Sequence, residues 1–162
     1  MLTQARLKEL LHYDPDTGAL TWRVAPSNCV KAGSVAGAIT TYGYVQVSVD
    51  STLRRAHRLA FLYMVGEIPP NAVDHVNGDR ADNRWCNLRL ATPSENQQNL
   101  RGPLSNSKSG LLGVSWHARG KKWQAQIKVD AVKHHLGCFT DKHEAHAAYL
   151  KAKAELHPFS TL

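Results

Sequence analysis

Cysteine is scarce in this 162-residue sequence, and its three copies, Cys29, Cys86 and Cys138, lie far apart. No C-x-x-C pair occurs, so a zinc ribbon or a zinc knuckle is not expected. An odd number of isolated cysteines fits a reducing compartment. We therefore expect three ordinary thiols and no bound zinc.

Long apolar runs are also missing. No stretch is long enough to cross a bilayer, and no basic start precedes an apolar segment of the kind found in signal peptides. We therefore expect a cytoplasmic protein with no membrane partner. The apolar content of 43% is normal for a globular chain, and the length suits one ordinary domain or two small ones.

Positive charge is in excess, and it is unevenly placed. The net charge is +7. Residues 1–100 hold ten Lys/Arg against nine Asp/Glu, whereas residues 101–162 hold ten against four. The last third therefore carries nearly all of the basic excess, which is typical of a domain that binds a polyanion such as nucleic acid.

The first 70 residues read as alternating short elements by their hydrophobic periodicity and turn residues. Pro69 and Pro70 end this part of the chain. The expected elements are a helix at 3–12, strands at 19–24 and 44–50, and a buried helix at 57–65 with Gly66 as its C-terminal cap.

The segment 73–99 has the pattern strand, loop, strand, helix. Val73–His75 reads as a strand end, and the turn residues of 77–84 require a loop. Asn87–Ala91 reads as a second strand. Thr92 and Glu95 have the spacing of a capping box with a proline between them, which predicts a helix that contains Asn96.

This pattern brings together a carboxylate (Asp74), an imidazole (His75) and a carboxamide (Asn96). Mg²⁺ or Mn²⁺ prefers oxygen ligands and takes only one or two of them from protein, so Asp74 and Asn96 are candidate metal ligands. An imidazole near neutral pH is a suitable general base for a water molecule, which makes His75 the candidate base.

The same residues resemble the HNH nucleases of phages and group I introns. The resemblance covers roughly residues 44–99 and runs through Val73-Asp74-His75-Val76-Asn77-Gly78-Asp79 to Glu95-Asn96. It implies a ββα-metal fold with Asp74 as metal ligand and His75 as base. It also implies that Asn87 braces the loop, that Asn96 is the ligand from the helix, and that Asn99 contacts a phosphate or supports the other ligands.

Structural roles compete with functional ones at several neighbouring positions. His57 is interpreted as a packed or capping residue rather than a catalytic one. The turn-forming residues of the loop, more readily structural than metal-binding, are Asn77, Gly78, Asp79 and Asn83. The arginines that either contact phosphate or lie solvated at the surface are Arg58, Arg84 and Arg89.

The last third predicts a three-stranded antiparallel sheet with one packed helix. Residues 101–110 are small and polar, as in a linker, so we expect an HNH nuclease domain at 1–100 and a second domain at 111–162. The expected strands are 112–118, 123–129 and 133–139, and the expected helix is 142–156. The fold class is therefore α+β.

Residues 110–158 resemble the APETALA2-type DNA-binding domain. The residues that carry this resemblance are Leu112–Trp116, Lys122–Ile127, His135–Phe139 and Glu144–Tyr149. In that family a three-stranded sheet enters the major groove, and its exposed face contacts bases and phosphates. Trp116 and Trp123 are expected in the core. The exposed positions that match are Ser115, His117, Arg119, Gln124, Gln126, Lys128, Lys133 and His135.

The sequence thus predicts a site-specific, homing-type HNH endonuclease that acts on double-stranded DNA without a small-molecule cofactor. As a monomer or weak dimer with one active site, it would nick one strand. Such a protein would be encoded by a phage and work in a bacterial host. Two alternatives are a DNA-binding regulator with a vestigial HNH unit, and a structure-specific or packaging-associated phage nuclease.

Overall fold

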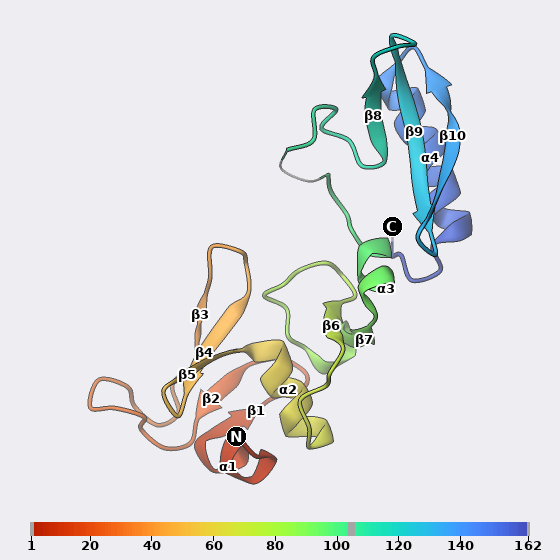
Figure 1. The fold of residues 1–162 in the computed structure, drawn as a ribbon. Helices are drawn as coiled ribbons and strands as arrows, with labels where there is room; N and C mark the ends of the chain where they lie inside the picture. The colour runs from red at the N-terminus through yellow and green to blue at the C-terminus, as the bar shows by residue number, and fades with distance from the viewer. Residues whose placement is uncertain (1, 104–105, 162) are drawn as a thin grey trace. The chain divides into compact units, whose positions relative to one another are not determined.

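The computed structural model describes residues 2–103 and 106–161, and part of the predicted linker, 104–105, lies outside them. The chain divides into two compact units, Met1–Ala91 and Thr92–Leu162 (Figure 1). Both combine helices with small antiparallel sheets, which confirms the predicted α+β class. Among the described residues, no helix is long and apolar enough to cross a membrane.

The first unit starts with helix α1 (Gln4–Leu10), and Thr3 caps it by accepting a hydrogen bond from the Arg6 amide. Strand β1 (Leu11–Tyr13) follows at once and pairs with β2 (Leu20–Trp22). The sequence predicted a helix through residue 12, because Leu7, Leu10 and Leu11 have helical spacing. The chain leaves the helix earlier because Leu11 is buried as part of the hairpin.

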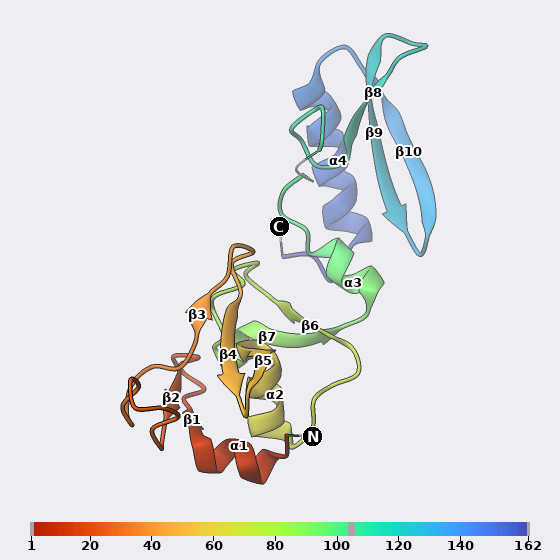
Figure 2. The same ribbon diagram turned by 60° about the vertical axis from the view of Figure 1, so that its left-hand side comes forward.

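A second sheet has the strand order β3 (Ala38–Ile39), β4 (Val45–Val49) and β5 (Thr52–Arg55). Helix α2 (Ala56–Val65) continues directly from β5 and packs against α1, β4 and β5 (Figure 2). It ends at Gly66, whose φ of 95° is the left-handed cap predicted from the sequence. Leu59 and Ala60 of α2 are fully buried.

The third sheet of this unit is a two-stranded ribbon. Strand β6 (Ala72–His75) pairs antiparallel with β7 (Leu88–Ala91), and the 3-10 turn η1 (Trp85–Asn87) leads into β7. Residues 76–84 form the intervening loop. The predicted strand–loop–strand is therefore confirmed, with boundaries that differ by a residue.

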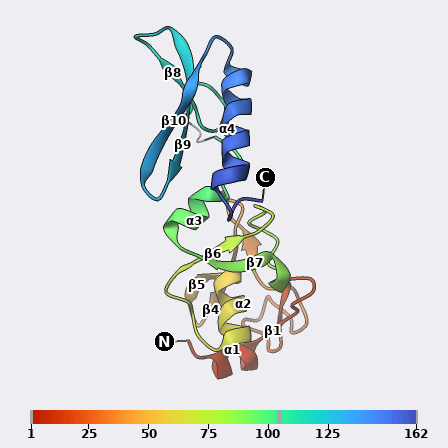
Figure 3. The same cartoon turned by 90° about the vertical axis from the view of Figure 1, so that its right-hand side faces the viewer.

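The second unit begins with α3 (Pro93–Gln98), and both hydrogen bonds of the Thr92–Glu95 capping box are present. Strands β8 (Val114–His117), β9 (Lys122–Val129) and β10 (Val132–Phe139) form a sheet in the order β10-β9-β8. Figure 3 shows helix α4 (Lys142–Leu156) lying along one face of this sheet. The core between them contains Ala125, Ile127 and Tyr149.

The second compact unit starts at Thr92, ahead of the expected linker at residues 101–110. The buried Lys153 of α4 donates a hydrogen bond to the carbonyl of Leu100, and the Phe159 amide donates one to Gln98 Oε1. These bonds tie the end of α3 to the C-terminal part of the chain. Ser109, within the expected linker, is also buried and donates to the carbonyl of Val114.

Candidate active site and nucleic-acid interface

Asp74 and Arg89 face each other across the β6–β7 ribbon, because the strand register makes them cross-strand partners. Arg89 donates from Nε and Nη2 to Asp74 Oδ2, each at 3.0 Å. Asp74 is buried, so the ion pair with Arg89 compensates for the hydration that its carboxylate loses. Arg89 therefore forms an ion pair with Asp74, a contact that the sequence did not predict.

His75 follows Asp74 on β6 and is buried with a different set of neighbours. Its Nε2 lies 3.4 Å from Asn83 Oδ1. The Asn83 amide is oriented by its Nδ2, which donates to the carbonyl of Ala81 at 2.9 Å. Because Asn83 Oδ1 can only accept, Nε2 must carry the imidazole proton, and the basic lone pair then lies on Nδ1.

Burial keeps this imidazole neutral. It lowers the pKa of His75 below its usual value of 6.5, and the hydrogen bond that His75 donates to Asn83 and the nearby Asp74 oppose the shift only in part. A neutral imidazole at physiological pH is the form that accepts a proton. The chemistry expected of His75 is therefore available where the structure places it.

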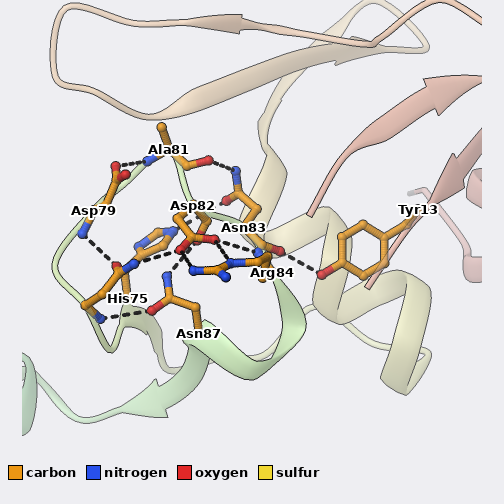
Figure 4. A network of polar contacts seen from close by, with 9 residues as sticks. Tyr13, His75, Asp79, Ala81, Asp82, Asn83, Arg84 and Asn87 are labelled. Atoms are coloured by element: carbon orange, nitrogen blue, oxygen red, sulfur yellow. Dashed lines mark hydrogen bonds and ion pairs between the residues drawn. The ribbon is translucent and has the colours of Figure 1, made fainter. Parts of the chain in front are cut away.

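Asn87 closes the loop between β6 and β7 (Figure 4). Its Oδ1 accepts a hydrogen bond from the Asn77 amide at 2.9 Å, and its Nδ2 donates to the carbonyl of Asp82 at 2.8 Å. Asp82 also binds the Arg84 guanidinium, which lowers the pKa of its carboxyl to about 2. Both ends of the loop are thus fastened to one buried carboxamide.

The β1–β2 hairpin supports the same loop from outside. The Tyr13 hydroxyl donates to the carbonyl of Asn83 at 2.7 Å, and burial raises the pKa of this phenol, so it remains a donor (Figure 4). The Trp85 amide donates to the carbonyl of Pro15. Asn83 is accordingly more than a turn former, since it is buried and contacts both His75 and Tyr13.

Two aromatic residues lie beside His75: His57, which the sequence predicted to be packed or capping, and Tyr44, which the sequence did not connect with the site. The ring of His57 lies edge-on to that of His75, with 5.1 Å between centroids, and Tyr44 contacts both rings. Burial, followed by the proximity of His75, lowers the pKa of His57 to about 3. His57 lies in the first turn of α2, within the part of the chain that resembles the HNH family, but the sequence does not show that its ring contacts His75.

The remaining two residues predicted for the site belong to the second unit. Asn96 is exposed on α3. Asn99 follows α3 and is buried, and its Oδ1 accepts a hydrogen bond from the Thr161 hydroxyl at 2.9 Å. Burial argues against the phosphate contact expected of Asn99. The pairing of Asn96 with Asp74 stays a prediction.

Comparison with known proteins bears on this site. Residues 54–98 match a family described as HNH endonuclease. Over 93 residues the chain is 34% identical to protein 3.8 of Escherichia phage T7, a match that covers 57% of this chain and 75% of the phage protein. The chain belongs to the HNH endonuclease family. The matched segment includes Asp74, His75, Asn87 and Asn96.

Two further similarities were found for this HNH endonuclease. It is 28% identical over 112 residues to an uncharacterized HNH endonuclease of Acanthamoeba polyphaga mimivirus, covering 68% of this chain and 57% of that protein. It therefore spans little more than half of the mimivirus protein. A solved structure described as "DNA binding and cleavage by the HNH homing endonuclease I-HmuI" aligns with a TM-score of 0.44 and 19% identity, covering 78% of this chain and 71% of that one.

The donor chemistry of the HNH endonuclease fits a hard divalent cation. Among the described residues, no group of three or more His, Cys, Asp or Glu side chains gathers as a metal cage. The carboxylate of Asp74 is an oxygen donor of the kind preferred by a cation such as Mg²⁺, which keeps most of its water and binds phosphate oxygens. Asn96 offers a carboxamide oxygen, and its part in the same metal site stays a prediction.

The sheet of the second unit has one polar face. Strand pairing places Ser115 opposite Gln124, His135 opposite Gln126, and Lys133 opposite Lys128. Paired residues in antiparallel strands lie on the same face, and Ala125 and Ile127 of β9 point to the opposite, helix-covered face. The Gln124 amide also contacts His135 Nδ1 at 2.8 Å.

The remaining candidates lie at one end of this face. His117 is the last residue of β8, and Arg119 lies in the exposed turn before β9. The eight candidate DNA contacts of this sheet are thus on the polar face or the adjoining turn, and only Gln124 and Gln126 among them are half-buried.

Trp116 corrects one expectation for the core of this sheet. It shares the face of the buried Val114, as predicted, but its side chain is 47% exposed. Its cross-strand partner Trp123 is half-buried and packs edge-on against it, with 5.0 Å between ring centroids. The alternation in the sequence indicates the face of a residue, but not whether a helix covers that end of the sheet.

Proposed function

We propose that this HNH endonuclease hydrolyses a phosphodiester bond of double-stranded DNA at a specific site, with His75 as general base and with one divalent cation, Mg²⁺ or Mn²⁺, bound by Asp74 and Asn96. The main support is the hydrogen bond between His75 and Asn83. It holds a buried, neutral imidazole with its proton on Nε2, next to the carboxylate of Asp74.

The chemistry follows from this arrangement. His75 Nδ1 takes a proton from a water molecule as the water oxygen bonds to phosphorus. The bond from phosphorus to the 3′ oxygen breaks, and that oxygen takes a proton from solvent, which leaves a 5′-phosphate and a 3′-hydroxyl. When bound, the cation supplies stabilisation of charge on the scissile phosphate. Asn83 orients the base, and Asn87 holds the loop.

The second unit is proposed as an APETALA2-type DNA-binding module that chooses where the nuclease cuts. Its polar face and the basic excess of residues 101–162 support this role. With one active site per chain, a monomer or weak dimer nicks one strand, as expected of a homing-type enzyme. The similarity to a protein of phage T7 supports a phage-encoded protein that works in the cytoplasm of a bacterial host.

A nicking assay on supercoiled plasmid carrying candidate sites tests the proposal. With Mg²⁺ or Mn²⁺ the wild type should convert the plasmid to the open circle, and EDTA should stop it. His75→Ala should lower the rate by about 100-fold or more, the usual contribution of a general base. His134→Ala, which alters an exposed histidine of β10, is the matched control and should cut normally.

A wild type that shifts the mobility of DNA but never cuts it would favour the regulator with a vestigial HNH unit. Cleavage that depends on branched or looped DNA, rather than on a base sequence, would favour the structure-specific nuclease.

A further inference from the structure

Two arginines lie against one aromatic ring beside His75. The guanidinium of Arg55 is 4.1 Å from the centroid of the Tyr44 ring, and that of Arg80 is 5.0 Å from it. The same ring lies 6.2 Å from the His75 ring, between centroids. Arg55 ends β5 and Arg80 belongs to the loop after β6, so residues far apart in sequence meet at Tyr44.

Neither cation is neutralised within the described part of the chain. No ion pair joins Arg55 or Arg80 to a carboxylate there. The two loop carboxylates nearest in sequence to Arg80 are engaged elsewhere, Asp79 with the Ala81 amide and Asp82 with Arg84. Both arginine side chains are exposed, so a ligand can reach them.

Arg80 is held by a second contact. Its Nη1 donates to the carbonyl of Tyr42 at 3.1 Å, in the turn between β3 and β4. A guanidinium donates hydrogen bonds in its own plane, so contact of its face with an aromatic ring leaves other donors available for oxygen atoms. Two such groups, unpaired and restrained by one ring, are suited to a phosphate with several acceptor oxygens.

We propose that Arg55 and Arg80, restrained by Tyr44, clamp a backbone phosphate of the DNA substrate beside His75. The clamp rests on the proposed nuclease function and assigns residues of the first unit to the substrate. Tyr44 is a positioning residue, because it acts on the phosphate only through the two arginines. The clamp aligns the backbone for attack, so it contributes mainly to the rate of cleavage of bound DNA.

Four variants of the full chain test the clamp, with the plasmid nicking rate measured at saturating and at limiting DNA. Arg55→Gln, Arg80→Gln and Tyr44→Leu should each lower kcat by about tenfold or more. Tyr44→Leu removes no charge, so a lower kcat in this variant would report on the positioning of the two arginines. Tyr44→Phe keeps the ring and should restore the rate to within about threefold of the wild type.

Arg23→Gln is the matched control, since it removes one exposed positive charge from the same unit without touching Tyr44. Its kcat should not change. Thermal unfolding of every variant separates a lost clamp from a lost fold. The clamp is overturned if Arg55→Gln and Arg80→Gln cut at the wild-type rate, or if Arg23→Gln loses as much as they do.

A second measurement keeps the clamp testable should the wild type cut no DNA, which would refute the proposed nuclease. DNA affinity is then measured against salt concentration. Arg55→Gln and Arg80→Gln should each reduce the slope of log K against log salt by about 0.9, the value for one phosphate contact. An unchanged slope for DNA overturns the clamp, even if the protein binds inorganic phosphate tightly.

Discussion

His57 is a buried histidine whose neutral form the fold requires. Its Nδ1 has no hydrogen-bond partner among the described residues, and burial, with His75, Arg55 and Arg58 nearby, lowers its pKa from 6.5 to about 3. Between pH 6.5 and pH 3 the unfolded chain therefore binds a proton at this position that the folded chain excludes. Stability is intact above pH 6.5 and falls as the pH decreases through this window.

Replacement of His57 by Leu should remove this contribution. Urea unfolding between pH 7 and pH 4 should show the wild type losing up to about 1.4 kcal/mol per pH unit more than His57→Leu. His117→Gln, at an exposed histidine, should keep the wild-type pH dependence. Parallel pH profiles for wild type and His57→Leu would show that His57 titrates normally in the folded protein.

The sequence was enough to select the candidate catalytic side chains, but not to predict which side chains pair with them. Asp74 and His75 were recognised because they combine a carboxylate and an imidazole before a loop of turn residues. The pairing of Asp74 with Arg89 depends on the register of two four-residue strands, which so short an alternation does not determine. The contact of His57 with His75 depends on how α2 packs, which no local pattern encodes.

At the level of elements, the β1–β2 turn supports the loop between β6 and β7. A Cβ on Gly18 would lie 2.4 Å from the backbone nitrogen of Arg84, and Gly18 has a φ of 74°. Gly18→Ala should therefore displace the loop that carries Asn83, which lowers both the nicking rate and the melting temperature. Gly33→Ala is the control, because Gly33 has a φ of 84° but no heavy atom within 4 Å of the added methyl.

Comparing these two alanine variants separates backbone strain from displacement of the loop. Both should lose about 1 kcal/mol of unfolding free energy from the positive φ. Only Gly18→Ala should also lose nicking activity. Equal activity in the two variants would mean that the hairpin does not hold the loop.

Elements with local signals at their ends were predicted well. Gly66 and the capping pair Thr92–Glu95 mark helix ends through local hydrogen bonds, and the structure has them where the sequence placed them. Strands β1, β3 and β5, of two to four residues, were missed because their own residues show no clear strand pattern. Such strands exist through pairing with a longer neighbour, a contact that the local sequence does not display.

At the level of the whole molecule, the proposed function places cutting in the first unit and site selection in the second. The site at His75 lies in the first unit, whereas the polar sheet face lies in the second, within the basic part of the chain. Loss of a phosphate contact on the sheet should then lower the affinity for DNA and make that affinity less dependent on salt concentration. It should leave cleavage at saturating enzyme unchanged, in contrast to changes at Arg55 or Arg80.

Lys128 and Lys151 provide a matched pair for this division of labour. Both are exposed lysines of the second unit, but Lys128 lies on the polar face of β9 and Lys151 on helix α4. Lys128→Gln should lower the slope of log K against log salt by about 0.9 and weaken binding, while Lys151→Gln should do neither. The two variants carry the same charge, so equal slopes would show that net charge, and not the sheet face, determines DNA affinity.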